Sequence, residues 1–212
     1  MNADVKRILN GMMEEYIDEV LESNGFKRRK NSFIYSRKIG ITKQKIEMIS
    51  FSHPSYHPGA LAHVYPWLTI HFPDISEVAV QMVEEELIDN WKDITIRQPI
   101  QIYTNSERWI LMDEIGVKSL AEDIEMFISE HTIPLLDDLR CVDDFIKFYE
   151  AQDKRLIMDD KRYLYIVSAY ILQKDYINAQ KVLELRFGKP GLRKRYASAF
   201  NYLENIISAS NT

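Results

Sequence analysis

The sequence predicts an α+β fold, with a mostly antiparallel sheet of about five strands packed with helices and followed by a helical C-terminal region. Apolar and polar residues alternate in several short segments before residue 113, as in half-buried strands. The N-terminus and everything after Gly116 instead show helical spacing. The composition, 46% hydrophobic and 28% charged over 212 residues, is that of a globular chain.

The N-terminal segment predicts one amphipathic helix. Its apolar residues recur every three or four positions: Val5, Ile8, Leu9, Met12, Met13, Tyr16, Ile17, Val20 and Leu21. Gly25 follows the last of them, so we expect it to end the helix in a left-handed conformation.

Three strands are predicted next, at residues 32–38, 44–52 and 64–72, with a hairpin turn at Gly40 between the first two. In the third, Leu68, Ile70 and Phe72 fall on one side, and Trp67, Thr69 and His71 on the other. Pro66 cannot donate a ladder hydrogen bond, so we expect this strand to begin late or to lie at an edge.

A capped helix over residues 74–91 follows the strands, since apolar residues at helical spacing face an acidic outer side. Two further strands, within 93–103 and 107–113, are expected to form a hairpin that turns at Asn105–Ser106. Together these segments form a predicted α+β domain over residues 1–113.

Residues 114–150 predict helices that pack on this domain, one of them opened by Pro134 at a first-turn position. Residues 151–160 are the best candidate for a linker. Residues 161–212 predict a helical hairpin, similar to the tetratricopeptide type because small residues such as Ala169 and Ala179 permit close packing, and then a capping helix.

The totals exclude several classes of protein. A net charge of −5 argues against a chain that binds nucleic acid over its whole surface. The single cysteine, Cys141, excludes an intramolecular disulfide framework, and we expect it to be a buried thiol within a helix. We find no signal peptide and no apolar run of about 20 residues, so the expected location is the cytoplasm.

Four of the five histidines lie in one stretch, at His53, His57, His63 and His71. A zinc site needs three or four ligands around one point, and His53, His57 and His63 are the candidates. A proline follows both His53 and His57, which favours extended backbone in a loop. We therefore interpret residues 53–63 mainly as an exposed connection between strands, with a metal-dependent hydrolase that uses all four histidines as the alternative.

Charge is unevenly distributed. Residues 113–160 hold fourteen acidic and five basic residues, a net −9, whereas residues 161–212 hold three acidic and nine basic ones, a net +6. A candidate basic patch comprises Lys27, Arg28, Arg29, Lys30, Arg193, Lys194 and Arg195. It could contact an acidic partner or phosphates, but docking of the basic tail helices on the acidic helices explains the same asymmetry.

The stretch from the first helix to the first strand resembles the DUF4304 domains, a group of small bacterial domains of unknown function. The residues that carry this resemblance are Asn24, Gly25, Phe26, Lys27, Arg28, Phe33 and Tyr35. It covers about residues 5–73, and Phe51–Ser52–His53 stands where the family often ends its second strand with a glutamine–serine pair. The resemblance implies an α+β domain and a bacterial source, and it brings no catalytic residues.

The function favoured by the sequence is therefore a non-enzymatic protein-interaction module, of an adaptor or immunity type, that needs no cofactor. The expected partner is another protein, with a homodimer possible and nucleic acid and membrane disfavoured. The candidate interaction surface consists of Tyr56, His57, Trp67, Thr69 and His71, because exposed aromatic residues on a sheet face are typical of interfaces.

Overall fold

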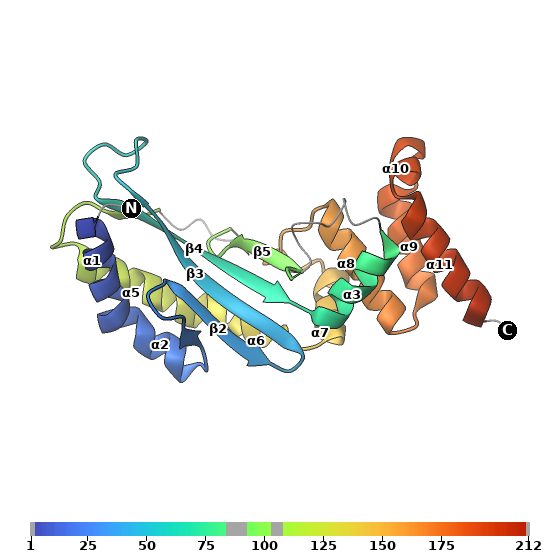
Figure 1. Ribbon diagram of the computed structural model, residues 1–212, viewed down its shortest axis with the longest axis horizontal. Helices are drawn as coiled ribbons and strands as arrows, with labels where there is room; N and C mark the ends of the chain where they lie inside the picture. The colour runs from blue at the N-terminus through green and yellow to red at the C-terminus, as the bar shows by residue number, and fades with distance from the viewer. Residues whose placement is uncertain (1–2, 84–92, 103–107, 211–212) are drawn as a thin grey trace. The chain divides into compact units, whose positions relative to one another are not determined.

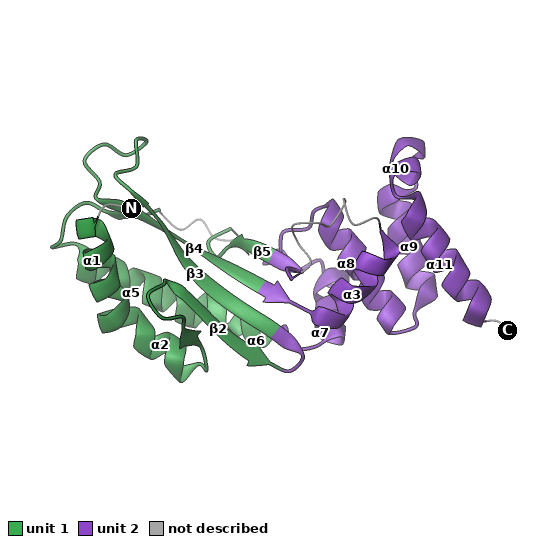
Figure 2. Cartoon of the chain, in the orientation of Figure 1, with its two compact units in different colours: residues 1–39, 43–69, 97–138 green, residues 40–42, 70–96, 139–212 purple. Residues whose placement is uncertain are grey.

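The structure is a computed structural model that describes residues 3–83, 93–102 and 108–210. The chain divides into two compact units, coloured separately in Figure 2. Unit 1 comprises residues 1–39, 43–69 and 97–138, and unit 2 comprises residues 40–42, 70–96 and 139–212. The domain boundaries expected at 113, 150 and 160 stay predictions, because each of these units combines segments that are separate in the sequence.

The described residues confirm the α+β class, with an antiparallel sheet in the order β1-β2-β3-β4-β5 and β6 also paired with β4 (Figure 1). The strands are β1 (Lys27–Arg28), β2 (Ile34–Ile39), β3 (Thr42–Ser52), β4 (Ala62–His71), β5 (Ile96–Pro99) and β6 (Trp109–Leu111). β6 runs against the start of β4, with Val64 opposite Trp109. The turn expected at Asn105–Ser106 lies outside the described residues.

Pro66 lies inside β4, and this strand has neighbours on both sides, so the expectation of an edge or a late start was wrong. The carbonyl of Pro66 accepts a hydrogen bond from the Ile100 backbone N–H at 3.0 Å. The N–H that proline lacks would point to that same side of the strand. On that side of β4, β6 pairs with residues 62–64 and β5 is the next neighbour.

The helices of unit 1 are α1 (Ala3–Met12), α2 (Asp18–Ser23), α5 (Val117–Phe127) and α6 (Ile133–Asp137), with π turns at Met13–Ile17 and Ile128–Thr132. They lie on one side of the sheet (Figure 1). The Tyr35 hydroxyl on β2 donates to Asp18 of α2, and the Gln44 amide on β3 donates to the Leu136 carbonyl of α6. The sheet thus has one face packed against helices and one face turned away from them.

The π turns interrupt what would otherwise be two continuous helices, and the spacing of the buried residues explains them. Each helix has a run of buried residues exactly four apart: Val5, Leu9, Met13, Ile17 and Leu21 in the first, and Leu120, Ile124, Ile128, Thr132 and Leu136 in the second. In a regular α-helix of 3.6 residues per turn such a run drifts by about 40° at each step. A π turn holds one extra residue, so it returns the run to the buried side. The single regular helix predicted for the N-terminus is corrected accordingly, while its left-handed end at Gly25 is confirmed by a φ of 81°.

A buried arginine joins the sheet to the helices of unit 1. The Arg37 side chain is only 6% exposed and donates to the Asp137 carboxylate at 2.7 Å, to the Asn24 carbonyl at 2.9 Å and to the Gln44 amide oxygen at 2.8 Å. Its guanidinium also lies 4.6 Å from the centre of the Phe26 ring. These contacts satisfy a charge that would otherwise be costly to bury.

Unit 2 is mainly helical. Its helices are α3 (Pro73–Met82), α7 (Val142–Glu150), α8 (Asp160–Leu172), α9 (Tyr176–Phe187), α10 (Pro190–Arg195) and α11 (Ala197–Ser210). α8 packs against α3, α7 and α9, and the fully buried Ala169 and Ala179 fit the close α8–α9 packing that the sequence predicted. Residues 84–91 of the helix expected over 74–91 lie outside the described residues.

Cys141 was expected to be a buried thiol within a helix, which was wrong: it precedes the first residue of α7 and is partly exposed. It forms a capping box with Asp144, whose carboxylate accepts from the backbone N–H groups of Arg140 and Cys141 at 3.0 Å each. A polar side chain three residues inside a helix start is a capping signal. Asp144, three residues after Cys141, therefore marked the start of α7 in the sequence. The regular apolar spacing across residues 135–149 nevertheless suggested one continuous helix.

Within the described ranges, no helix is both long enough and apolar enough to cross a membrane.

Candidate functional site

The face of the sheet turned away from the unit 1 helices carries a cluster of rings, here called the aromatic face: Phe51, Tyr56, His63, Tyr65 and Trp67. Odd-numbered residues of β3 and β4 point to this side, because strand side chains alternate and the even-numbered ones, from 42 to 48 in β3 and throughout β4, are buried. Ring centres are 6.0 Å apart for Phe51 and His63, 5.4 Å for His63 and Tyr65, and 5.9 Å for Tyr65 and Trp67. The rings therefore form a continuous row across two strands.

The aromatic face is most open to solvent at one end, where Phe51 and Tyr56 both lie against His63. Phe51 is 47% exposed and Tyr56 is 52% exposed, whereas Tyr65 and Trp67 are half-buried. Thr69 and His71 were predicted to share this surface, but each is only 8% exposed. These two residues point to the expected side of β4 without being accessible, so they do not contribute to the exposed cluster.

Two arginines stack on the aromatic face. The Arg97 guanidinium lies 4.8 Å from the Trp67 ring centre and forms an ion pair with Glu47 at 3.4 Å. The Arg108 guanidinium lies 5.3 Å from the Tyr56 ring centre. A cation above an aromatic ring is attracted by its negative face, which holds both partners in place. The cluster therefore combines large flat apolar area with fixed positive charge.

His63 is the buried centre of the cluster. It is 6% exposed, and the Tyr56 hydroxyl lies 2.5 Å from its Nδ1 atom. Burial lowers the pKa of His63, and the positive charge of Arg108 lowers it further. The neutral ring is therefore favoured near pH 7, and Nδ1 can then accept a hydrogen bond from Tyr56. Its Nε2 atom is buried and has no hydrogen-bond partner in the described part of the chain.

The loop that holds Tyr56 connects two strands, as the sequence predicted, but it is built from turns, and the extended backbone expected at His53 was wrong because its φ is 47°. The His53 N–H donates to the Leu61 carbonyl at 2.9 Å, and the His57 N–H donates to the Pro54 carbonyl at 3.0 Å. His53 and His57 are exposed, in contrast to His63. In the ranges that the structure describes, no three His, Cys, Asp or Glu side chains are grouped as metal ligands.

The predicted basic patch falls on two different units. In unit 1, Lys27, Arg29 and Lys30 are exposed, but Arg28 pairs with Asp18 at 3.0 Å. Arg28 thus has a structural role in fixing the turn between α2 and β2.

In unit 2, Arg193 pairs with Glu184 at 2.6 Å, and its guanidinium lies 4.1 Å from the Phe200 ring centre. Lys194 and Arg195 of this part are exposed. The candidate patch is therefore partly exposed charge and partly charge engaged within each unit.

Sequence reasoning identified Tyr56 and Trp67 but missed Phe51, Tyr65 and the two arginines. Strict alternation along β3 and β4 was a sufficient signal for Phe51 and Tyr65, since both are odd-numbered members of predicted strands. No local pattern marks Arg97 or Arg108, because their stacking partners are 30 or more positions away in the chain.

Comparisons of the chain with family models, curated proteins and solved structures find no match. The resemblance to DUF4304 domains therefore stays a prediction.

Proposed function

We propose that this chain is a non-enzymatic protein-interaction module, of an adaptor or immunity type, and that it binds its partner protein through the aromatic face. The observation that carries the proposal is the row formed by Phe51, Tyr65 and Trp67 with stacked arginines. Residues that dominate protein–protein binding energies are most often Trp, Tyr and Arg. Interfaces are also enriched in Phe and depleted in Lys and Asp.

The charge around the aromatic face indicates the chemistry of the partner. Lys38, Lys43 and Lys45 are exposed on the same side of β2 and β3, beyond the two arginines, and Glu47 is the acidic residue among them. An acidic partner surface with apolar side chains at its centre would complement this arrangement. Glu47 pairs with Arg97, so among the described residues the unpaired positive charge on this side comes mainly from the lysines, and Arg108 would add to it beside Tyr56.

Site-directed photo-crosslinking in the cells that naturally produce the chain tests this proposal. A photoreactive phenylalanine replaces Phe51 in one variant and Met126 in a control, because Met126 is a similarly exposed apolar residue, at 54%, on α5 of the same unit. We expect one protein to be linked at position 51 and not at 126. Adding Trp67→Ala should abolish that link.

Affinity of the purified pair gives the quantitative test. Trp67→Ala should weaken binding by about 2 kcal/mol or more, roughly 30-fold, whereas Met126→Ala should change it less than twofold. Equal crosslinking at both positions would contradict the proposal. A link that nuclease treatment removes would indicate a nucleic acid instead, and a link to a second copy of the chain would indicate self-association.

A further inference from the structure

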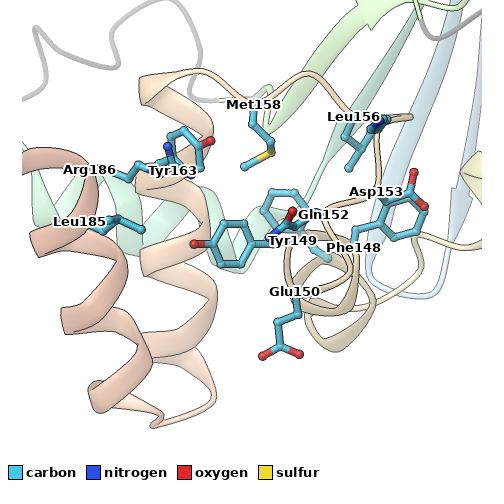
Figure 3. Close-up of a pocket in the computed structure, with 12 residues that line it drawn as sticks. Phe148, Tyr149, Glu150, Gln152, Asp153, Leu156, Met158, Tyr163, Leu185 and Arg186 are labelled. Atoms are coloured by element: carbon cyan, nitrogen blue, oxygen red, sulfur yellow. The ribbon is translucent and has the colours of Figure 1, made fainter.

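Unit 2 contains a pocket that is separate from the aromatic face. It encloses about 480 Å³ between the end of α7, the segment 151–158, the start of α8 and the end of α9 (Figure 3). This volume is within the range of small-molecule sites. The segment expected to be a linker therefore forms one wall of a pocket, and Leu156 in it is buried.

The lining of this pocket combines aromatic and apolar side chains with polar and charged ones. Tyr149 and Tyr163 meet edge to face with ring centres 6.2 Å apart, and Phe148 lies on the side of the segment 151–158. Met158 and Leu185 contribute aliphatic surface, and Leu185 is 71% exposed. Flat rings and flexible apolar side chains of this kind favour a planar aromatic ligand.

The acidic residues at the pocket are already engaged. The Glu150 carboxylate accepts a hydrogen bond from the Tyr170 hydroxyl at 2.9 Å, and in Figure 3 it points away from the rings. The Asp153 carboxylate accepts from the Arg155 guanidinium at 2.9 Å. Hydrogen bonds from Arg155 keep the pKa of Asp153 low although burial alone would raise it. The Arg155 guanidinium neutralises Asp153, and the Glu150 carboxylate, which keeps its charge, is turned away from the aromatic lining.

The basic residues at the pocket are not neutralised in this way. Lys154 and Arg186 are exposed, and among the residues that the structure describes neither has a carboxylate within ion-pair distance. The Arg186 guanidinium lies 3.8 Å from the Tyr163 ring centre, at the edge of the aromatic lining. Positive charge therefore borders the apolar pocket on two sides, from α9 and from the segment 151–158.

We infer that this pocket binds a small planar aromatic anion, with its ring against Tyr149 and Tyr163 and its acidic group toward Arg186 and Lys154. The inference does not depend on the proposed function, because all the residues that carry it belong to unit 2. A carboxylate suits both cations, and arginine can bind it through two parallel hydrogen bonds.

Three probes of matched shape test the site in the full-length protein: 2-naphthoate, 2-naphthamide and 2-naphthylmethylammonium, each titrated by calorimetry or by protein NMR shifts. We expect 2-naphthoate to bind about tenfold more tightly than the neutral amide, and the cation to bind most weakly. Equal binding of all three, preference for the cation, or no binding of 2-naphthoate would each overturn the inference.

Substitutions locate the interaction. Arg186→Gln and Lys154→Gln should each weaken 2-naphthoate binding about threefold and leave 2-naphthamide unchanged, whereas Tyr149→Ala should weaken both probes. Lys194→Gln is the control, since it removes an exposed charge of unit 2 that does not line the pocket. A loss with Lys194→Gln equal to that with Arg186→Gln would show a general charge effect and would refute the assigned site.

Discussion

Replacing Arg37 by alanine should be among the most damaging single changes in unit 1. The substitution removes the hydrogen bonds to Asp137, Asn24 and Gln44. It leaves the Gln44 amide oxygen, on a residue with no exposed area, and the Asn24 carbonyl without that donor. It also removes the packing of the guanidinium on Phe26. Breaking a buried, hydrogen-bonded ion pair costs about 3–5 kcal/mol, because the remaining partners cannot all be solvated.

Substituting Asp137 separates the part of this cost that comes from the ion pair from the part that comes from unpaired hydrogen-bond acceptors. The Asp137 side chain is 35% exposed, so water can solvate it when Arg37 is absent. Asp137→Asn should therefore cost only about 1 kcal/mol. Arg29→Ala, which removes an exposed arginine from the same unit, should change stability by less than about 0.5 kcal/mol.

Hydrogen–deuterium exchange of peptides from β2 and β3 is the appropriate assay, because it reports on unit 1 alone when two units need not unfold together. A loss of 3 kcal/mol accelerates exchange from the globally unfolded state by about a hundredfold or more. If Arg37→Ala exchanged within about fivefold of the wild type, or no faster than Asp137→Asn, the reasoning from buried unsatisfied partners would be refuted.

Three further predictions concern single residues. Because the folded-state pKa of His63 is lowered, the stability that its neutral ring contributes is fully present above about pH 6.5 and is lost as the pH falls through the lower folded value. An NMR titration of the ring should have its midpoint below 6.5. A midpoint above 6.5 would contradict a buried neutral His63. The Thr132 hydroxyl is fully buried and lacks a hydrogen-bond partner within the described ranges. Thr132→Val should therefore raise the free energy of unfolding, measured by urea denaturation, by about 1 kcal/mol. A lower free energy of unfolding would show that the hydroxyl is hydrogen-bonded. Gly40 has a φ of 55°, and a Cβ there would meet the Arg140 carbonyl oxygen at 2.4 Å, so Gly40→Ala should lower stability by about 2 kcal/mol or more. Gly59→Ala, with a φ of 87° but only an ordinary 3.8 Å contact with Met112, should cost less.

The alternation along the strands made much of the sheet predictable. Trp67 and Leu68 were assigned to opposite faces of β4 from their positions alone, and the structure places them so. The burial of Thr69 and His71 was not predictable, because alternation gives the side of a strand but not what covers it. The position of Pro66 within a central strand was not predictable either, because no local pattern records which strands lie on its two sides.

The helices show a similar division between local and long-range information. The end of the first helix at Gly25 follows from its own neighbours in the chain, as a left-handed cap does. The stacking of Arg97 on Trp67 and of Arg186 on Tyr163 joins residues distant in sequence, so the aromatic face and the pocket of unit 2 could only be completed by the fold.

The π turns of unit 1 bear on how this chain can change length during evolution. Each turn holds one residue more than a regular helix needs, so deleting an exposed residue such as Glu15 would leave an ordinary α-helix. The spacing between Met13 and Ile17 would then shorten from four to three, which a 3.6-residue helix keeps on one face. A deletion elsewhere in either helix would rotate the residues that follow it out of the core. Homologous sequences should therefore place single-residue gaps at residues 13–17 or 128–132 in preference to other parts of these helices.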